Sequence, residues 1–190
     1  LFRSAGSLMS KNSRVHALKA DVRDAAAAAG VIDLIEREHG RLDVLVNNAG
    51  IIRDTLIMAM DEADWGDVLA TNLTGVFNCV KPAARLMIRR RQGAIVNLSS
   101  IAATRPGRGH SNYAASKGGV EALTKALAAE LAGKKIRVNC VAPGMIETDM
   151  SKDVRQVAGD QILDRILFKR YGTPQDIANA VLFLASDLAA

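Results

Sequence analysis

The sequence predicts an α/β fold in which helices cover both faces of a parallel sheet. Strand-like and helix-like hydrophobic patterns alternate along the 190 residues, and three of the strand-like runs are almost continuously apolar. Alternation of this kind favours a parallel sheet, because parallel neighbours need a crossover connection that is usually a helix. Continuous apolar strands are typical of a sheet that is buried on both faces.

The first predicted elements are a weakly alternating stretch at 15–20, which ends at Asp21, and an alanine-rich helix at 25–38. The helix is predicted from the helical spacing of its apolar residues, and Gly40 follows as a stop signal. A short apolar run at 42–46 ends at two asparagines and is bounded like a buried strand.

A long helix is predicted at 61–91, because apolar residues form a stripe along one side of it. Pro82 is expected to kink this helix, since proline has no backbone N–H to donate. The remaining predicted elements are, in order, a strand at 93–98, a helix at 111–132, a strand at 136–141 and a helix from Pro174 through Ala185. Gly133 ends the first of these helices, and Thr173 caps the second.

Composition excludes several classes of protein. With 49% hydrophobic residues the chain can bury a core, and its length fits one domain spanning 1–190. The net charge of +5 is scattered, and 4% aromatic residues are too few for base-stacking platforms, so no nucleic-acid partner is expected. Cys79 and Cys140 are far apart in apolar surroundings, which indicates a reducing, cytoplasmic location. Neither a metal cluster nor a membrane span is expected.

Polar residues gather where the predicted strands end. They are Asp21, Asn47, Asn48, Ser99, Ser100 and Thr148. In an open α/β sheet, ligands bind beyond the carboxyl ends of the strands. These residues therefore mark the candidate binding edge of the sheet.

Tyr113 and Lys117 are four residues apart in a predicted helix and share one face. A lysine ammonium near a phenol favours the phenolate, so the pKa of Tyr113 is expected to fall and suit acid–base catalysis. Taken alone, the pair also fits an ordinary amphipathic helix. Ser100 can donate a hydrogen bond to a carbonyl oxygen, or it can serve as a plain turn residue. Asn72 lies on an apolar stripe, where a buried amide needs a water or a backbone carbonyl as partner.

Together these signals resemble the short-chain dehydrogenase/reductase family. The matching motifs, in family order, are Asn47-Asn48-Ala49-Gly50, Thr71-Asn72-Leu73, Ser99-Ser100, Tyr113-Ala114-Ala115-Ser116-Lys117 and Val138-Asn139-Cys140-Val141-Ala142-Pro143-Gly144. The resemblance implies a Rossmann-like doubly wound sheet. Within the family, the segments at 50–54, 143–150 and 172–178 are most similar to bacterial 3-oxoacyl-(acyl carrier protein) reductases and, less specifically, to acetoacetyl-CoA reductases.

The resemblance also implies a role for each matching residue. Tyr113 would give a proton to the substrate carbonyl, Ser100 would hydrogen-bond its oxygen, and Lys117 would bind the nicotinamide ribose. Asn72 would hold a water in a proton relay. The residues implied in cofactor binding are Arg3, Asp21, Val22, Asn48, Ala49, Gly50, Tyr113, Lys117, Pro143, Gly144, Ile146 and Thr148.

The chain departs from the family pattern at its ends. The family opens with a strand and a T-G-x-x-x-G-x-G turn, and neither precedes Arg3. The sheet is therefore expected to lack its first βα unit and its last strand, so that the domain at 1–190 is incomplete at both ends.

Three functions compete at this point. The first is an NADPH-dependent reductase of a 3-oxoacyl thioester, which is expected to be carried on acyl carrier protein in fatty acid synthesis; Arg3 would pair with the 2′-phosphate of NADPH. The second is a binding relative without catalysis, and the third is an alcohol or steroid dehydrogenase that runs oxidatively with NAD. A homotetramer is expected through the helices at 61–91 and 111–132, whose outer faces would expose Leu86, Met87, Ala122 and Ala126.

Overall fold

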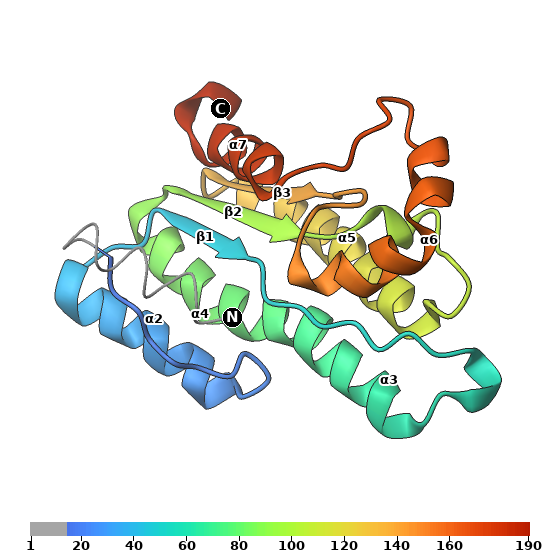
Figure 1. Ribbon diagram of the computed structural model, residues 1–190. Coiled ribbons are helices and arrows are strands. Elements are labelled where there is room, and N and C mark those ends of the chain that lie inside the picture. The colour runs from blue at the N-terminus through green and yellow to red at the C-terminus, as the bar shows by residue number, and fades with distance from the viewer. Residues whose placement is uncertain (1–14) are drawn as a thin grey trace.

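A three-stranded parallel sheet organises the computed structural model, which describes residues 15–190 (Figure 1). Its strands are β1 (Val44–Asn47), β2 (Gly93–Leu98) and β3 (Ile136–Val141), and they lie in the order β1-β2-β3. The register pairs Asn47 with Asn97 and Asn97 with Cys140. The predicted parallel α/β sheet is thus confirmed.

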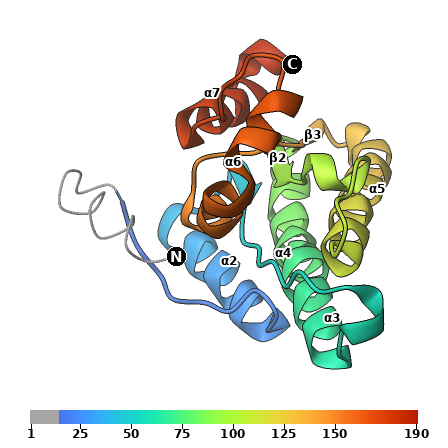
Figure 2. The ribbon, with the colours of Figure 1, turned by 45° about the vertical axis from the view of Figure 1, so that its right-hand side comes forward.

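Helices cover both faces of this sheet. The larger helices are α2 (Ala25–His39), α3 (Glu62–Leu69), α4 (Gly75–Arg90), α5 (Ser111–Ala132), α6 (Lys152–Arg165) and α7 (Pro174–Ala185). Figures 1 and 2 show α2, α4 and α5 on one side of the sheet and α7 on the other. The register agrees with this view. Val138 packs in the core with α4 and α5, whereas its neighbour Arg137 donates from the opposite face to the Leu184 carbonyl of α7, at 2.6 Å.

The main core lies between the sheet and helices α4 and α5. Its buried members are Val76, Val80, Ala84, Met87, Ile95, Val120, Leu131, Ile136 and Val138. A smaller cluster joins α2 to α4 through Ile32, Ala83 and Leu86. Leu86 and Met87 were expected on an outer face, and that expectation was wrong. Leu86 is buried against α2, and Met87 is buried in the main core between the sheet, α4 and α5. Of the four residues proposed for a subunit contact, Ala122 and Ala126 are exposed.

Not every strand is buried on both faces. In β2, the residues at 94–98 are all buried, but Val44 and Val46 of β1 are 37% and 42% exposed. These two valines lie on the same face as Ala94 and Val96, their partners in β2. Helix α7 packs over β2 and β3, so it leaves that face of β1 open.

The stretch at 15–20 is not a strand, contrary to the prediction. It is extended but forms no ladder, and all of its residues except Val15 are exposed. A strand is stabilised by a neighbour that accepts and donates its backbone hydrogen bonds, and no described strand lies beside this stretch.

The long helix at 61–91 is confirmed as one continuous helical run, and it contains an irregularity that was not predicted. A π-helical turn at Ala70–Thr74 joins α3 to α4, and it lies well before Pro82. Its centre is Asn72, whose side chain is fully buried. The local departure from α geometry therefore coincides with a buried polar side chain, as is common for π turns at functional sites.

Several boundaries match the predicted ones. Helix α5 spans Ser111–Ala132 with Gly133 as its C-cap, and Thr173 caps α7, where Pro174 is the first helical residue. Gly40 ends α2 in the left-handed conformation, with φ of 67°. Helix α6 was missed, because its apolar residues show almost no helical periodicity and none of them is buried.

Candidate active site

The site lies where β1, β2 and β3 end and the first turns of α5 begin. Strand β2 delivers Ser99 and Ser100, whereas Tyr113 and Lys117 come from α5. The Ser99 backbone N–H donates to the Val141 carbonyl at 2.8 Å, so the strand pairing continues one step beyond β2. This brings segments far apart in the sequence to one edge of the sheet, as predicted.

Lys117 is the buried cation of the site. Its residue is 5% exposed, and Nζ donates to the Leu98 carbonyl at 2.7 Å. Nζ also lies 5.7 Å from the centroid of the Tyr113 ring, which confirms that the two side chains share a face. Burial disfavours the charged form and lowers the pKa of Lys117 to about 8.

The pKa of Tyr113 differs from the expectation. Burial raises it above its ordinary value, the Ser100 side chain opposes this rise, and the negative charge of Asp54 adds to it. The expected fall does not appear, because the Lys117 ammonium is directed to the Leu98 carbonyl. In this structure Tyr113 is therefore a firmly protonated phenol, which is the form that donates a proton.

The two serines after β2 have separate tasks. Ser99 is buried, and its hydroxyl contacts the Lys117 carbonyl at 3.1 Å and a Glu121 carboxylate oxygen at 2.9 Å, so it anchors β2 to α5. The Ser100 hydroxyl accepts from the Ala102 N–H at 3.2 Å. Its hydrogen bond with the Tyr113 side chain lowers the pKa of that phenol. Ser100 is thus the serine that faces the phenol.

Asn72 finds the partners that a buried amide requires. Its Oδ1 accepts from the Ile51 N–H at 2.8 Å, and its Nδ2 donates to the Ile51 carbonyl at 2.9 Å and to the Ser116 hydroxyl at 3.1 Å. A backbone partner was one of the two alternatives left open by the sequence. The paired bonds clamp the segment after β1 against the π-helical turn and α5.

Gly50 lies in the narrow space between this clamp and the lysine. A Cβ at this position would lie 3.3 Å from Asn72 Oδ1 and 3.6 Å from Lys117 Nζ. Just before it, Asn48 is exposed and Ala49 is half-buried, so both line the open side of the sheet edge. Asn47 instead belongs to the interior, where it donates to Asn97 Oδ1 at 2.8 Å.

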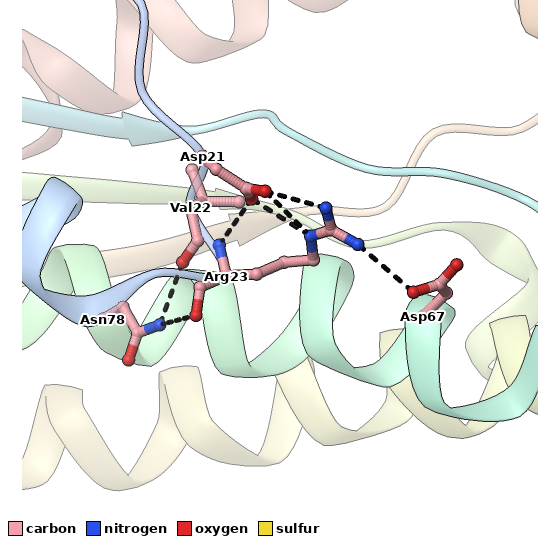
Figure 3. Close-up of polar contacts among 5 residues, drawn as sticks. All are labelled: Asp21, Val22, Arg23, Asp67 and Asn78. Carbon is pink, nitrogen blue, oxygen red and sulfur yellow. Dashed lines mark hydrogen bonds and ion pairs between the residues drawn. The ribbon is translucent and has the colours of Figure 1, made fainter. Parts of the chain in front are cut away.

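Asp21 and Val22, which the family resemblance implies in cofactor binding, lie in a loop beside α3 and α4. Figure 3 shows Arg23 paired with the Asp21 carboxylate, with Nη2 and Oδ2 2.8 Å apart. Arg23 Nη1 also pairs with Asp67 of α3 at 3.2 Å. Asn78 of α4 donates to the carbonyl oxygens of Val22 and Arg23, at 2.9 and 3.2 Å. The loop at 21–23 is therefore tied to the helical run beneath it.

We expect Gly75→Ala to loosen this loop. A Cβ there would lie 2.7 Å from Val22 Cγ2, and a β-branched side chain has little freedom to move away. Overpacking of this kind typically lowers the free energy of unfolding by about 1–3 kcal/mol. Gly66→Ala in α3 is the matched control, because nothing lies within 4 Å of its Cβ. Chemical denaturation should show a loss for the first variant and a small gain for the second, since alanine favours the helix; equal stability of the two would contradict the steric argument.

The loop after β3 carries the last predicted binding residues. The Pro143 carbonyl accepts from the Ile101 N–H at 2.8 Å, which ties this loop to the end of β2. Ile146 pairs with Gly172, and Thr148 caps a short turn by accepting and donating with Ser151. Gly144 is exposed, with nothing within 4 Å of a built Cβ. Arg3 lies outside the described residues.

The sequence comparisons agree with this geometry. Residues 3–190 match the profile of a family described as enoyl-(acyl carrier protein) reductase. The chain is 49% identical to the 3-oxoacyl-(acyl-carrier-protein) reductase FabG of Staphylococcus aureus, over 91% of this chain and 70% of that protein. It is 47% identical to the Thermotoga maritima reductase of the same name, over 88% of this chain and 68% of that protein.

The chain belongs to the short-chain dehydrogenase/reductase family. The resemblance inferred from the motifs is thereby confirmed. Membership makes it a reductase-like enzyme of the kind that binds a nicotinamide dinucleotide.

The residues present fit such a cofactor. Gly50 lets Asn72 and Lys117 lie close to the backbone, because a Cβ there would be 3.3 Å from Asn72 Oδ1 and 3.6 Å from Lys117 Nζ. Lys117 and Tyr113 offer a buried ammonium and a phenol, which suit ribose hydroxyls. Asp21 and Val22 offer a carboxylate beside an apolar surface, which suits an adenine ring. Lys117, Tyr113, Asn48 and Val22 would thus hold the two halves of the dinucleotide.

Sequence reasoning missed the residues that support those it found. Asn112 is fully buried and donates to the Arg53 carbonyl at 3.0 Å. Asp54 and His110 form a contact of 3.2 Å beside Tyr113. The sequence offered one signal for Asn112: it is a polar residue directly before Tyr113. Polar residues are uncommon at positions that a helix buries. Within residues 15–190, no group of three or more His, Cys, Asp or Glu side chains is arranged to hold a metal ion, and no helix there is long and apolar enough to span a membrane.

Proposed function

We propose that the protein reduces a 3-oxoacyl thioester to the 3-hydroxyacyl thioester with NADPH. The observation that carries the proposal is the meeting of Ser100, Tyr113, Lys117 and Asn72 at one edge of the sheet, in a chain 46–49% identical to proteins named as 3-oxoacyl-(acyl-carrier-protein) reductases. Tyr113 is protonated and half-buried, so it can deliver a proton to an oxygen that becomes negative.

In this proposal each residue acts on the ketone oxygen or on its proton supply. Bound NADPH would supply the hydride that the carbonyl carbon accepts. The carbonyl oxygen takes the proton of Tyr113, and the product is a secondary alcohol. Ser100 donates a hydrogen bond to the same oxygen and stabilises the charge that develops on it. Lys117, with its pKa of about 8, supports the phenolate that Tyr113 leaves behind.

Asn72 contributes through structure in this proposal. Its hydrogen bonds to both backbone groups of Ile51 join the π-helical turn to the segment after β1 and set the position of Gly50. A water held near the Ile51 carbonyl and Lys117 would return a proton to Tyr113 after each turnover. This relay and the other site roles are proposals.

Two thioester substrates test the proposal directly. The purified protein is mixed with NADPH and acetoacetyl-CoA, and oxidation of the cofactor is followed by absorbance. We expect turnover with this 3-oxoacyl thioester and little with crotonyl-CoA, an enoyl thioester that lacks the ketone. Turnover of crotonyl-CoA alone would favour the activity named by the family profile. No turnover of either, with NADPH bound, would favour a binding relative without catalysis.

NADPH is expected to be preferred over NADH. By the family resemblance, residues 1–4 correspond to the end of the family's second strand. Arg3 is a cation there and would pair with the 2′-phosphate, whereas an acidic residue at this position would take the ribose hydroxyls. The kcat/KM values for the two cofactors measure this preference, and Arg3→Asp should reverse it. A wild-type preference for NADH would contradict the assignment and favour an NAD-dependent alcohol dehydrogenase.

Three finer points stay predictions. The thioester would be carried by acyl carrier protein, with coenzyme A as the alternative. The protein would form a homotetramer through α4 and α5, where exposed Phe77, Ala122 and Ala126 remain as candidate contacts. It would act in the cytoplasm.

A further inference from the structure

Three contacts join the loop after β1 to the start of α5 and the residues just before it. Asn112 Nδ2 donates to the Arg53 carbonyl at 3.0 Å, and the Thr55 N–H donates to the Gly109 carbonyl at 3.0 Å. Between these two hydrogen bonds, His110 Nε2 lies 3.2 Å from Asp54 Oδ2. These contacts hold the loop against the residues just before Tyr113, which follows Asn112 in the chain.

The His110 ring is oriented from both sides. Its Nδ1 accepts a hydrogen bond from the Gly107 N–H at 3.3 Å, so the proton of a neutral ring sits on Nε2, which faces Asp54. The ring also stands edge-on to Tyr113, with centroids 6.3 Å apart and planes at 74°. His110 therefore contacts both the Asp54 carboxylate and the ring of Tyr113, the proposed proton donor.

Asp54 is partly withdrawn from water. Its side chain is 32% exposed, and burial raises its pKa while His110 opposes that rise. Its negative charge acts on Tyr113, whose own pKa it raises. Two other charged groups near the phenol, Lys117 and Arg53, have partners of their own. Lys117 is directed to the Leu98 carbonyl, and Arg53 pairs with Asp64 at 3.7 Å.

We propose that Asp54 and His110 are positioning residues for Tyr113, through which the loop after β1 sets where the phenol lies. His110 holds the Asp54 carboxylate in place, and the carboxylate charge opposes formation of a phenolate. The proposal rests on the proposed role of Tyr113 as proton donor.

Titration of the Tyr113 phenol tests this without using activity. The phenolate absorbance of each protein is measured against pH and compared with the same protein carrying Tyr113→Phe, so that the difference reports Tyr113 alone. Asp54→Asn should lower the titration midpoint by roughly 0.5–1 pH unit, because a nearby negative charge is lost. His110→Leu should lower it by less, since Asp54 remains but is no longer held. His110→Gln should restore it, because an amide keeps a donor for Asp54.

Asp64→Asn is the matched control, because it removes a carboxylate of α3 that pairs with Arg53, whereas Ser100 and Asp54 are the side chains that shift the pKa of Tyr113. The kcat/KM profile against pH should move with the phenol midpoint in the Asp54 and His110 variants and stay in place in the control. Thermal unfolding shows whether each variant is folded, and the near-isosteric Asn and Gln variants keep the test open if His110→Leu is not.

An unchanged phenol midpoint in both Asp54→Asn and His110→Leu would overturn the proposal, and so would a midpoint that Asp64→Asn changes as much as Asp54→Asn does. So would equal midpoints in all variants. None of these results touches the assignment of Tyr113 itself, which fails only if Tyr113→Phe stays active.

Discussion

Tyr113→Phe is expected to lower kcat by about 10²–10⁴-fold, the contribution that a general acid typically makes. Phenylalanine keeps the ring that packs against His110 and Lys117 but removes the hydroxyl that Ser100 contacts. Because Tyr113 contacts α5 and its neighbours mainly through this ring and its backbone, the fold should persist. Steady-state turnover of acetoacetyl-CoA measures the loss.

Binding separates this loss from damage to the site. The NADPH dissociation constant of Tyr113→Phe should change far less than kcat, because Lys117 and Gly50 are untouched. Tyr171→Phe is the matched control, since it removes the other tyrosine hydroxyl of the 190 residues, which donates to the Gly159 carbonyl of α6. Turnover of the Tyr113 variant within a factor of two of wild type would remove Tyr113 from the mechanism.

Lys117→Met is expected to lower kcat/KM by about 10²-fold or more, since one charged donor in a site of this kind contributes on that scale. The variant loses the ammonium that lies 5.7 Å from the phenol ring centroid, and the Leu98 carbonyl loses its donor. Methionine fills a similar volume, so the packing against Gly50 should be kept. Lys125→Met, an exposed position on the same helix, is the control and should keep full activity.

The same substitution makes a prediction about stability against pH. Folding lowers the pKa of Lys117 from 10.5 to about 8, so between these values the unfolded chain binds more protons than the folded one. The stability of wild type relative to Lys117→Met should therefore stay constant below pH 8 and rise with pH above it, by up to about 1.4 kcal/mol per unit. Denaturation of both proteins at several pH values measures this difference. A difference that falls above pH 8 would contradict the burial of a charged Lys117.

Elements with a strong local pattern could be predicted from the sequence. Helix α5 and strands β2 and β3 lie at the predicted residues, because their apolar spacing and their end signals, such as Gly133, agree with each other. Tyr113 and Lys117 were found for a related reason: a spacing of four on a helix fixes that two side chains share a face. Where local chemistry decided the outcome, the prediction held.

Features that depend on distant neighbours could not be predicted. The stretch at 15–20 has a strand-like pattern, but a strand forms only where a neighbour lies beside it. Met87 resembles an outer residue of its helix until the sheet and α5 are placed against it. The pKa of Tyr113 rises because burial and Asp54 outweigh Ser100, and no spacing in the sequence reveals the depth of the ring or the partner of the Lys117 ammonium.

The π-helical turn at Ala70–Thr74 also sets the phase of everything that follows it in the helix. One extra residue in a turn rotates all later side chains by about 100°, since an α-helix has 3.6 residues per turn. With the extra residue, Asn72 reaches Ile51 while Val76 and Val80 still face the sheet. A regular α-helix through the same residues would have to give up one of these two alignments. The turn therefore lets one helix serve the active site along its first half and the hydrophobic core along its second.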